Sequence, residues 1–502
     1  MTETIRKLLD NGAAEDIALG APGRIGLTYG ALKEHVETTV AALNARGIGR
    51  GDRVAIVLPN GPEMASAFLA VGAGATTAPL NPAYREEEFD FYLSDLNAKA
   101  LMVERGSDSP ALAAAKKRNI PVIEISWTDD KPAGWFQLEG TNGAGAATYA
   151  EPDDTALILH TSGTTSRPKI VPLSQCNVCA SASNIMNSLN LIPQDRCLNI
   201  MPLFHIHGLI AATLSSIGAG ASIFCCPGFN ALSFFSWMTE GEPTWYTAVP
   251  TMHQAILTRA ARNKDVIEAV KLRLIRSSSS SLPPQVMHEL EEAFGCPVIE
   301  AYGMTEAAHQ MASNPLPELP RKAGSVGLPA GPEVEIMSED GRILSRGDVG
   351  EIVIRGANVF SGYENNPSAN ADAFTDGWFR TGDQGVKDID GYISITGRLK
   401  EIINRGGEKI SPREVDETLM NHPAVQQVVT FAMPHDKLGE DVAAAVVLRD
   451  GMDADEKEIR EFASKHLADF KVPRKVLFLE EIPKGATGKL QRIGLAEKLG
   501  LG

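Results

Sequence analysis

As far as residue 390, helical patterns alternate with short β-branched runs, as where PEMASAFLAVGAG is followed by TTAPLNP. This alternation is typical of parallel α/β construction. Two segments also resemble each other, AVGAGATTAPLNP (70–82) and SSIGAGASIFCCP (215–227). Each has the pattern of a helix end, a Gly-Ala-Gly break and a strand. We therefore expect a large N-terminal region built from two related α/β subdomains.

The pattern changes from Gly341 onward to short strands separated by turns, GDVGEIVIRG and DGYISITGR. These predict a small β-rich subdomain packed on the larger region. A second break follows Arg398, after which the chain has its own helices and strands, including SPREVDETLMNH and AVQQVVTFAMP. We expect an N-terminal domain over 1–397, a hinge over 398–401 and a smaller, mobile α+β C-terminal domain over 402–502.

Composition and charge narrow the class of protein. The 502 residues are 43% hydrophobic and 22% charged, which is typical of a globular protein of two to four folding units. The net charge is −16 and no Lys/Arg-rich block is present, which disfavours a nucleic-acid binder. Leu209–Thr239 has no charged residue, but SSIGAGAS interrupts it, which favours a buried helix and a buried strand over a membrane span.

Six cysteines are too few for a secreted disulfide scaffold, so a reducing cytoplasm is the expected location. Cys176 and Cys179 form a C-x-x-C without a second pair, in a segment with a helical pattern. Two packed thiols explain them better than a metal or redox site.

The strongest local feature is an apolar strand, TALILH, that leads into Thr161-Ser-Gly-Thr-Thr-Ser-Arg-Pro-Lys169. Backbone N–H groups near Gly163, several hydroxyl groups and the Lys169 cation would form a concave site for a polyphosphate. The G-x-x-x-x-G-K-[ST] pattern is absent, so this is not a Walker A loop. A Ser/Thr-rich surface turn is the simpler alternative.

Two further segments place a carboxylate close to residues that could contact a base, a sugar or a phosphate. In EAYGMTEAAH, the Tyr302 ring could stack on a base, and Thr305 with Glu306 could hold phosphate and Mg²⁺. Glu306 could equally be a helix-initiating acid. In GWFRTGD, Asp383 after a glycine turn could accept both hydroxyls of a ribose, with Arg398 donating to the same sugar or to a phosphate. A hairpin turn is the alternative for this region.

A fourth segment near the C-terminus, PKGATGK, places Lys489 in a Gly-rich loop. There, a flexible ammonium group could be carried to a reacting carboxylate and phosphate. A solvated surface lysine is the alternative for this residue taken alone.

Together and in this order, TSGTTSRPK, YGMTE, RTGD, GRLKEIINRGGEKISPREVD and PKGATGK resemble the adenylate-forming superfamily of acyl-CoA synthetases. MPLFHIHG, TWYTAVPT, IRSSSSSL, YGMTEAAH and SNPLP are most similar to the oxalyl-CoA synthetases within it. The resemblance implies an ATP-dependent acid–thiol ligase that makes an acyl-adenylate and then an acyl-CoA, releasing pyrophosphate and AMP. It implies ATP, Mg²⁺ and coenzyme A as the small molecules bound. Separately, no carrier domain with a phosphopantetheine serine motif follows residue 502, so we expect a free-standing ligase with no carrier-protein domain.

The same resemblance implies roles for particular residues. Catalytic roles fall to Lys489, Thr305, Glu306 and His205, with Glu306 on the metal. ATP and AMP contacts fall to Thr161, Ser162, Gly163, Thr164, Thr165, Lys169, Glu300, Ala301, Tyr302, Gly303, Thr305, Asp383 and Arg398. Gly406, Gly407 and Lys409 would lie along the coenzyme A arm, and Lys400 occupies the hinge position, where many members carry Asp.

The nature of the acid follows from the candidate lining of its pocket. His205, Ser279 and His309 are polar, whereas a fatty-acid pocket should be apolar, because a buried unpaired polar group costs ~1–3 kcal/mol. We therefore expect a short polar carboxylic acid, oxalate first. Malonate, glycolate, acetate or a medium-chain fatty acid are the alternatives. Transfer to a carrier protein and a regulatory protein with a dead site are the rival functions.

Overall fold

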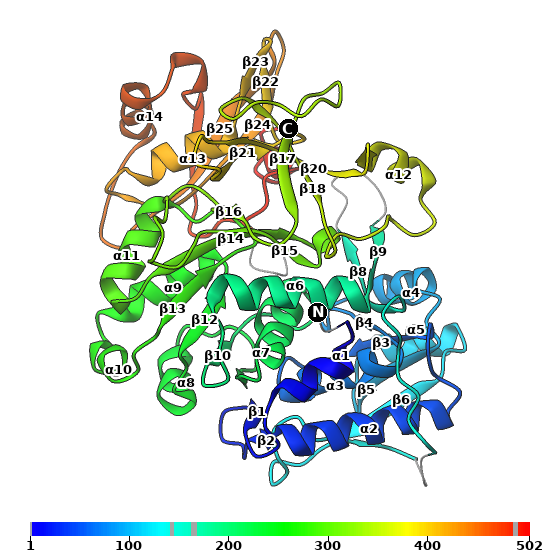
Figure 1. Cartoon of the computed structure of the whole chain (residues 1–502). Coiled ribbons are helices and arrows are strands. Elements are labelled where there is room, and N and C mark those ends of the chain that lie inside the picture. Colours follow the sequence, from blue (N-terminus) through cyan, green and yellow to red (C-terminus); the bar gives the residue numbers. More distant parts are fainter. Residues whose placement is uncertain (1–2, 141–144, 162–167, 485–489) are drawn as a thin grey trace.

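The computed structural model describes residues 3–140, 145–161, 168–484 and 490–502, which form a mixed α/β fold (Figure 1). The first sheet has seven strands in the order β7-β6-β5-β3-β4-β8-β9. They are β7 (Gln137–Leu138), β6 (Val122–Ser126), β5 (Ala100–Glu104), β3 (Arg53–Val57), β4 (Thr76–Pro79), β8 (Thr155–Thr161) and β9 (Lys169–Ser174). Strands β6 to β8 of this order are parallel, and the edge strands β7 and β9 are antiparallel to their neighbours.

The second sheet has nine strands in the order β16-β15-β14-β13-β12-β10-β11-β1-β2. They are β16 (Leu328–Pro329), β15 (His309–Ser313), β14 (Val298–Met304), β13 (Leu274–Ser277), β12 (Trp245–Ala248), β10 (Arg196–Asn199), β11 (Ser222–Cys225), β1 (Ile17–Gly20) and β2 (Leu27–Thr28). Its central strands are parallel, so the carboxyl ends of β12, β13 and β14 meet at one edge. In open parallel sheets this edge is where ligands bind.

The helices of the large domain cover both sheets. They are α1 (Ile5–Leu8), α2 (Tyr29–Ala45), α3 (Pro62–Gly74), α4 (Glu86–Asp95), α5 (Ala111–Lys117), α6 (Gln175–Leu189), α7 (Ser215–Gly218), α8 (Phe234–Gly241), α9 (Pro250–Ala260), α10 (Lys264–Ala269) and α11 (Pro284–Phe294), with the 3₁₀ turns η1 (Leu9–Asn11) and η3 (Thr305–Ala307) and the π-helix η2 (His207–Leu214). Helix α6 packs against β8, β9, β15 and η2, so it lies between the two sheets (Figure 1).

The predicted repeat of a helix followed by a strand is confirmed in each sheet, but the predicted Gly-Ala-Gly break is wrong for the first copy, where Gly72, Ala73 and Gly74 lie inside α3. The first copy is α3 followed by β4, and the second is α7 followed by β11. The segment 209–239 is divided among η2, α7, β11 and α8, and its helix and strand are buried, as expected. None of the helices in the described ranges is long and apolar enough to cross a membrane.

The β-rich subdomain is a five-stranded sheet made of β17 (Glu333–Met337), β18 (Val349–Arg355), β20 (Trp378–Lys387), β19 (Phe374–Thr375) and β21 (Ile393–Arg398), with α12 (Pro367–Ala373) beside it. It begins at Glu333, one strand earlier than the change of pattern at Gly341, because EVEIM pairs antiparallel with VGEIVIR.

The smaller C-terminal domain has its own five-stranded sheet, drawn in orange and red in Figure 1. Its strands are β22 (Ile403–Arg405), β23 (Glu408–Ile410), β24 (Val425–His435), β25 (Gly439–Leu448) and β26 (Lys475–Phe478), and its helices are α13 (Pro412–Met420), α14 (Glu456–His466), η4 (Asp469–Lys471) and α15 (Leu495–Lys498). The predicted helices and strands of this region are therefore confirmed. The domain contacts the large one where Gln254 donates to the carbonyl of Gln426, at 3.3 Å.

Candidate active site

The predicted phosphate loop joins β8 to β9, and Thr161 faces Lys169 across this antiparallel hairpin. The ammonium group of Lys169 lies 4.4 Å from the centre of the Tyr363 ring, a cation–π contact. Tyr363 comes from the segment between β18 and α12. The predicted contacts of Ser162, Gly163, Thr164 and Thr165 lie outside the described residues.

Glu306 lies in η3, directly after β14, and its side chain is buried. Its Oε1 accepts a hydrogen bond of 2.9 Å from the hydroxyl of the same Tyr363. Burial raises the pKa of Glu306, and the Tyr363 hydrogen bond and the nearby Arg398 and Lys169 cations oppose that rise. The structure therefore brings Lys169, which follows the predicted phosphate loop, and the predicted metal carboxylate together, with Tyr363 between them.

A second polar chain connects the end of β14 with the β-rich subdomain. The hydroxyl of Tyr302 donates to Oδ2 of Asp383 at 2.5 Å, and Nε of Arg398 donates to Oδ1 of the same carboxylate at 3.0 Å. Asp383 and Arg398 are register partners on β20 and β21. Burial and the neighbouring Asp383 carboxylate raise the pKa of Tyr302 far above its ordinary value, so Tyr302 stays a hydrogen-bond donor.

The three other predicted nucleotide residues on β14 are held closely by their surroundings. Burial raises the pKa of Glu300 to about 7. Oε1 of Glu300 accepts from the Leu282 amide at 2.9 Å, and its Oε2 has no hydrogen-bond partner in the described part of the chain. The carbonyl of Ala301 accepts from the Ser278 hydroxyl. Gly303 passes so close to β15 that a Cβ there would lie 1.8 Å from the carbonyl oxygen of His309. Only glycine fits at this crossing.

The predicted acid-binding residues lie beside the carboxyl ends of β12 to β14, but the histidine that joins them is His207. Its Nδ1 lies 3.0 Å from the Ser279 hydroxyl and its Nε2 lies 2.6 Å from the Thr247 hydroxyl. The His207 and His309 rings meet edge to face, with 5.0 Å between their centres. His205 is half-buried beside this group, and its Nδ1 accepts from the His207 amide at 3.3 Å.

Backbone conformation at this cluster is unusual for residues other than glycine. Ser279 has φ 72°, Ala308 φ 46° and His309 φ 101°. Such conformations cost of order 1–3 kcal/mol each and concentrate at functional sites, where surrounding contacts maintain them. His207 begins η2, and a π-helix is likewise concentrated at such sites.

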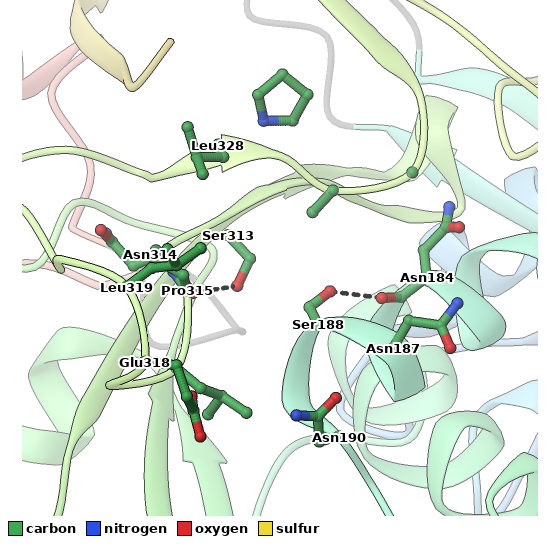
Figure 2. Close-up of a pocket in the computed structure, with 14 residues that line it drawn as sticks. Asn184, Asn187, Ser188, Asn190, Ser313, Asn314, Pro315, Glu318, Leu319 and Leu328 are labelled. Atoms are coloured by element: carbon green, nitrogen blue, oxygen red, sulfur yellow. Dashed lines mark hydrogen bonds between the residues drawn. The ribbon is translucent and has the colours of Figure 1, made fainter. Parts of the chain in front are cut away.

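A separate cavity of about 460 Å³ lies between α6 and the β15–β16 edge (Figure 2). Its lining is rich in amide and hydroxyl groups, among them Asn184, Asn187, Ser188 and Asn314. The hydroxyl of Ser188 donates to the carbonyl of Asn184 at 2.5 Å and accepts from Nε2 of Gln310 at 2.8 Å. Gln310 thus connects the wall of this cavity to the buried side of β15.

The residues predicted for coenzyme A are not brought to the ATP group. Gly406 and Gly407 form the turn of the β22–β23 hairpin, with φ 61° and 98°, and Lys409 is exposed on β23. Figure 1 draws this hairpin at the top, well away from β8 and β9. Lys400 is exposed in a turn closed by a hydrogen bond from the Glu401 amide to the Arg398 carbonyl. The prediction for Lys489 lies outside the described residues.

Sequence reasoning missed Tyr363, His207, Thr247 and Arg276. Tyr363 stands in a loop without a recognisable motif. His207 is the second histidine of FHIHG, two residues from the one that was chosen. Arg276 lies in the strand-like segment LRLIRS, where nothing in the sequence distinguishes it from an ordinary polar residue of a strand. Only the structure shows that its side chain is fully buried.

Comparison with known proteins gives the family. Residues 10–364 match the AMP-binding enzyme family, and residues 414–489 match the AMP-binding enzyme C-terminal domain. Two similar relatives are the oxalate–CoA ligases of Arabidopsis thaliana, 47% identical over 98% of each chain, and of Saccharomyces cerevisiae (strain ATCC 204508 / S288c), 42% identical over 89% of this chain and 87% of that one. The chain belongs to the AMP-binding enzyme family, and within it to the adenylate-forming acyl-CoA synthetases.

Solved structures of one relative superpose on the whole chain. The ATP-bound MatB of Rhodopseudomonas palustris, 30% identical over 99% of each chain, superposes with a TM-score of 0.90. Its apo form, with the same identity and coverage, reaches 0.81. The chain as a whole is therefore more similar to the ATP-bound form than to the apo form.

Proposed function

We propose that the protein joins oxalate to coenzyme A at the expense of ATP, through an oxalyl-adenylate. The observation that carries this proposal is the polar group of His207, Ser279, Thr247 and His309 beside the YGMTE segment. An alkyl chain gains no hydrogen bond from this group, and any donor that the internal bonds leave free would then be buried unpaired, at a cost of ~1–3 kcal/mol, whereas a second carboxylate would accept from it. The two relatives named oxalate–CoA ligase support the same acid.

For the ATP half of the reaction, we propose that the loop 161–169 holds the triphosphate, with Lys169 at its end. Glu306 fits as a ligand of Mg²⁺, because it is a carboxylate and the nearby Lys169 and Arg398 cations favour its ionised form. The described residues contain no cluster of three or more His, Cys, Asp or Glu side chains suited to a metal. One carboxylate together with substrate phosphates is how Mg²⁺ is commonly bound, and the ion would neutralise phosphate charge there.

For the nucleoside, Tyr302 and Gly303 would contact adenine, and Asp383 with Arg398 would contact the ribose. The Asp383 carboxylate already accepts from Tyr302 and Arg398, so the sugar hydroxyls would meet a positioned acceptor. Because the Glu300 carboxylate is buried against the Leu282 amide, Glu300 and Ala301 would contribute backbone atoms to this site.

In the first half-reaction, an oxalate oxygen attacks the α-phosphorus of ATP and pyrophosphate leaves. Both reactants are anions, so the site must supply positive charge and hold them in line. We assign that charge to Lys489, and we assign a contact with the phosphate to Thr305. The acid itself would be held by His205, Ser279 and His309, with His207 orienting Ser279.

In the second half-reaction, the coenzyme A thiol attacks the acyl carbon and AMP leaves with the carboxylate oxygen. We propose that the C-terminal domain turns about 398–401, including Lys400, so that Gly406, Gly407 and Lys409 reach the site. The greater similarity to the ATP-bound MatB than to its apo form, and the distant β22–β23 hairpin, support an arrangement that precedes this turn.

All six cysteines are free, which supports action in the cytoplasm.

The proposal is tested by measuring CoA-dependent AMP release with oxalate, malonate, glycolate, acetate and octanoate. We expect oxalate to give the highest kcat/KM and octanoate the lowest. Octanoate as the best substrate would refute the polar acid site, whereas malonate as the best would keep the site and change the acid.

A further inference from the structure

Arg276 on β13 is a fully buried cation without a counter-charge among the described residues. Its side chain is 0% exposed, its two described contacts are with neutral oxygens, and no described group accepts a hydrogen bond from its Nε. No described carboxylate forms an ion pair with it. Burial lowers the pKa of Arg276 to about 9, which leaves it charged at neutral pH. A buried charge that the protein leaves unpaired is expensive, and such charges are a common feature of ligand sites.

On one side of Arg276 the direction of every hydrogen bond can be assigned. The hydroxyl of Ser188 donates to the Asn184 carbonyl at 2.5 Å (Figure 2), so it accepts from Nε2 of Gln310 at 2.8 Å. The Gln310 amide is thereby oriented with Oε1 toward Arg276, whose Nη2 donates to it at 2.9 Å. This side of the chain anchors the guanidinium group to α6.

The other side leads to the acid site. Nη1 of Arg276 donates to the Thr247 hydroxyl at 3.4 Å. Among the described residues, the other partner of that hydroxyl is Nε2 of His207, at 2.6 Å, so Thr247 donates its hydrogen there. Nδ1 of His207 lies 3.0 Å from the Ser279 hydroxyl, so with Nε2 accepting from Thr247 the imidazole continues the chain by donating from Nδ1 to the Ser279 oxygen.

The chain ends at Ser279, whose own hydrogen then has to find an acceptor outside the chain. Ser279 is half-buried just after β13, in a left-handed backbone conformation. It lies beside the end of β14, where the Tyr302–Glu306 segment begins the proposed ATP site. A hydroxyl hydrogen fixed in this direction, with a cation behind it, suits an anionic oxygen.

We propose that Arg276 is a positioning residue for the acid substrate: through Thr247 and His207 it fixes a hydrogen-bond chain that makes Ser279 a donor to the second carboxylate of a short dicarboxylic acid. This inference rests on the proposed function and adds a structural basis for the selection of a dicarboxylate over a monocarboxylate. An acyl group without a second anionic oxygen gains nothing from the chain, whereas a carboxylate gains a charge-assisted hydrogen bond.

Thr247→Val tests the inference, because it removes the hydroxyl between Arg276 and His207 and keeps the shape of the side chain. We expect the KM for oxalate to rise ~10- to 100-fold, as for loss of a hydrogen bond to a charged group, while the KM for ATP is unchanged. Thr247→Ser should restore the wild-type KM. Tyr246→Phe removes a buried hydroxyl from the same strand, where it contacts His253, and should leave both constants unchanged.

A double-mutant cycle tests the same chain without a substitution at the buried Arg276. Ser279→Ala removes the last group of the chain, and Thr247→Val combined with it should be no worse than Ser279→Ala alone, because both break one chain. If the rises in the KM for oxalate caused by the two substitutions multiply in the double variant, the inference is overturned. Equal rises in the KM values for oxalate and ATP would also overturn it. In both cases, turnover of oxalate by the wild type would leave the proposed function intact. A wild type that ignores oxalate and malonate would overturn both.

Discussion

The hydroxyl of Tyr363 donates a hydrogen bond of 2.9 Å to Oε1 of Glu306. The same ring lies 4.4 Å from the Lys169 ammonium group, so one side chain contacts both the end of the phosphate loop and the proposed metal carboxylate. Glu306 therefore has an oriented oxygen before any substrate arrives.

Tyr363→Phe should weaken Mg²⁺-dependent binding of ATP. Phenylalanine keeps the ring under Lys169 and removes only the donor to Glu306. A hydrogen bond to a charged group contributes about 1.5–3 kcal/mol, so we expect the KM for MgATP to rise ~10- to 100-fold and the Mg²⁺ requirement to increase. Pyrophosphate exchange over a Mg²⁺ series measures this. An unchanged Mg²⁺ dependence would contradict the role of Tyr363.

Glu300→Gln should remove a pH dependence of stability. Burial raises the pKa of Glu300 from 4.5 to about 7 in the folded protein, so the folded state binds the proton more tightly than the unfolded state. Its stabilising contribution is complete below pH ~4.5 and is lost as the pH rises to ~7, by about 3 kcal/mol in all.

The measurement for Glu300 is Tm at pH 5 and at pH 8 for the wild type and the variant. Glutamine cannot ionise and can still accept from the Leu282 amide, so the variant should gain Tm relative to the wild type at pH 8 and gain less at pH 5. Glu292→Gln on α11, an exposed position, is the matched control and should show no such difference. A gain that is equal at both pH values would show that the pKa of Glu300 is not raised.

Gly303→Ala should displace His309 and abolish acid activation. The added Cβ would lie 1.8 Å from the His309 carbonyl oxygen and 2.5 Å from its Nδ1, so β15 must move away from β14. We expect at least a ~100-fold loss of kcat/KM for the acid, in line with the cost of misplacing a positioning group. Gly145→Ala, where nothing lies within 4 Å, is the control. A fully active Gly303→Ala enzyme would show that β15 tolerates the shift.

Lys489→Ala should separate the two half-reactions. The account assigns Lys489 to adenylate formation only, so the variant should lose ATP-dependent pyrophosphate release by at least ~100-fold, because it removes a charge that neutralises the transition state. Thioester formation from supplied oxalyl-adenylate should stay near the wild-type rate. Equal loss in both assays would refute the alternation of the C-terminal domain.

Much of the fold could be predicted because its signals are local. The alternation of helix and strand patterns placed α3 before β4 and α7 before β11. In the C-terminal domain the long strand β24 was predicted from AVQQVVTFAMP, whereas the short hairpin strands β22 and β23 were not predicted. The structural reason for glycine differs between the two copies of the repeat. Gly220 has φ 69° in the second, whereas Gly74 lies inside α3, where a Cβ would meet Val40 at 2.6 Å. The same Gly-Ala-Gly sequence therefore allows close helix packing in the first copy and a turn in the second.

The candidate site was only partly predictable, because its partners are brought together by tertiary structure. Glu306 and Lys169 stand in recognisable motifs, but the residue between them, Tyr363, does not. The burial of Arg276 and the hydrogen bonds of His207 depend on how β12, β13 and η2 meet, and no spacing in the chain encodes that contact. Sequence motifs therefore located the nucleotide groups better than the acid-binding groups.

The most direct test of the central claim follows an oxygen atom. If oxalate attacks the α-phosphorus of ATP, the oxygen that forms the new bond leaves with AMP when the thiol displaces it. With ¹⁸O-labelled oxalate, ATP and coenzyme A, mass spectrometry should find one ¹⁸O atom in AMP for each oxalyl-CoA formed. Oxalyl-CoA formation with unlabelled AMP would contradict an oxalyl-adenylate intermediate.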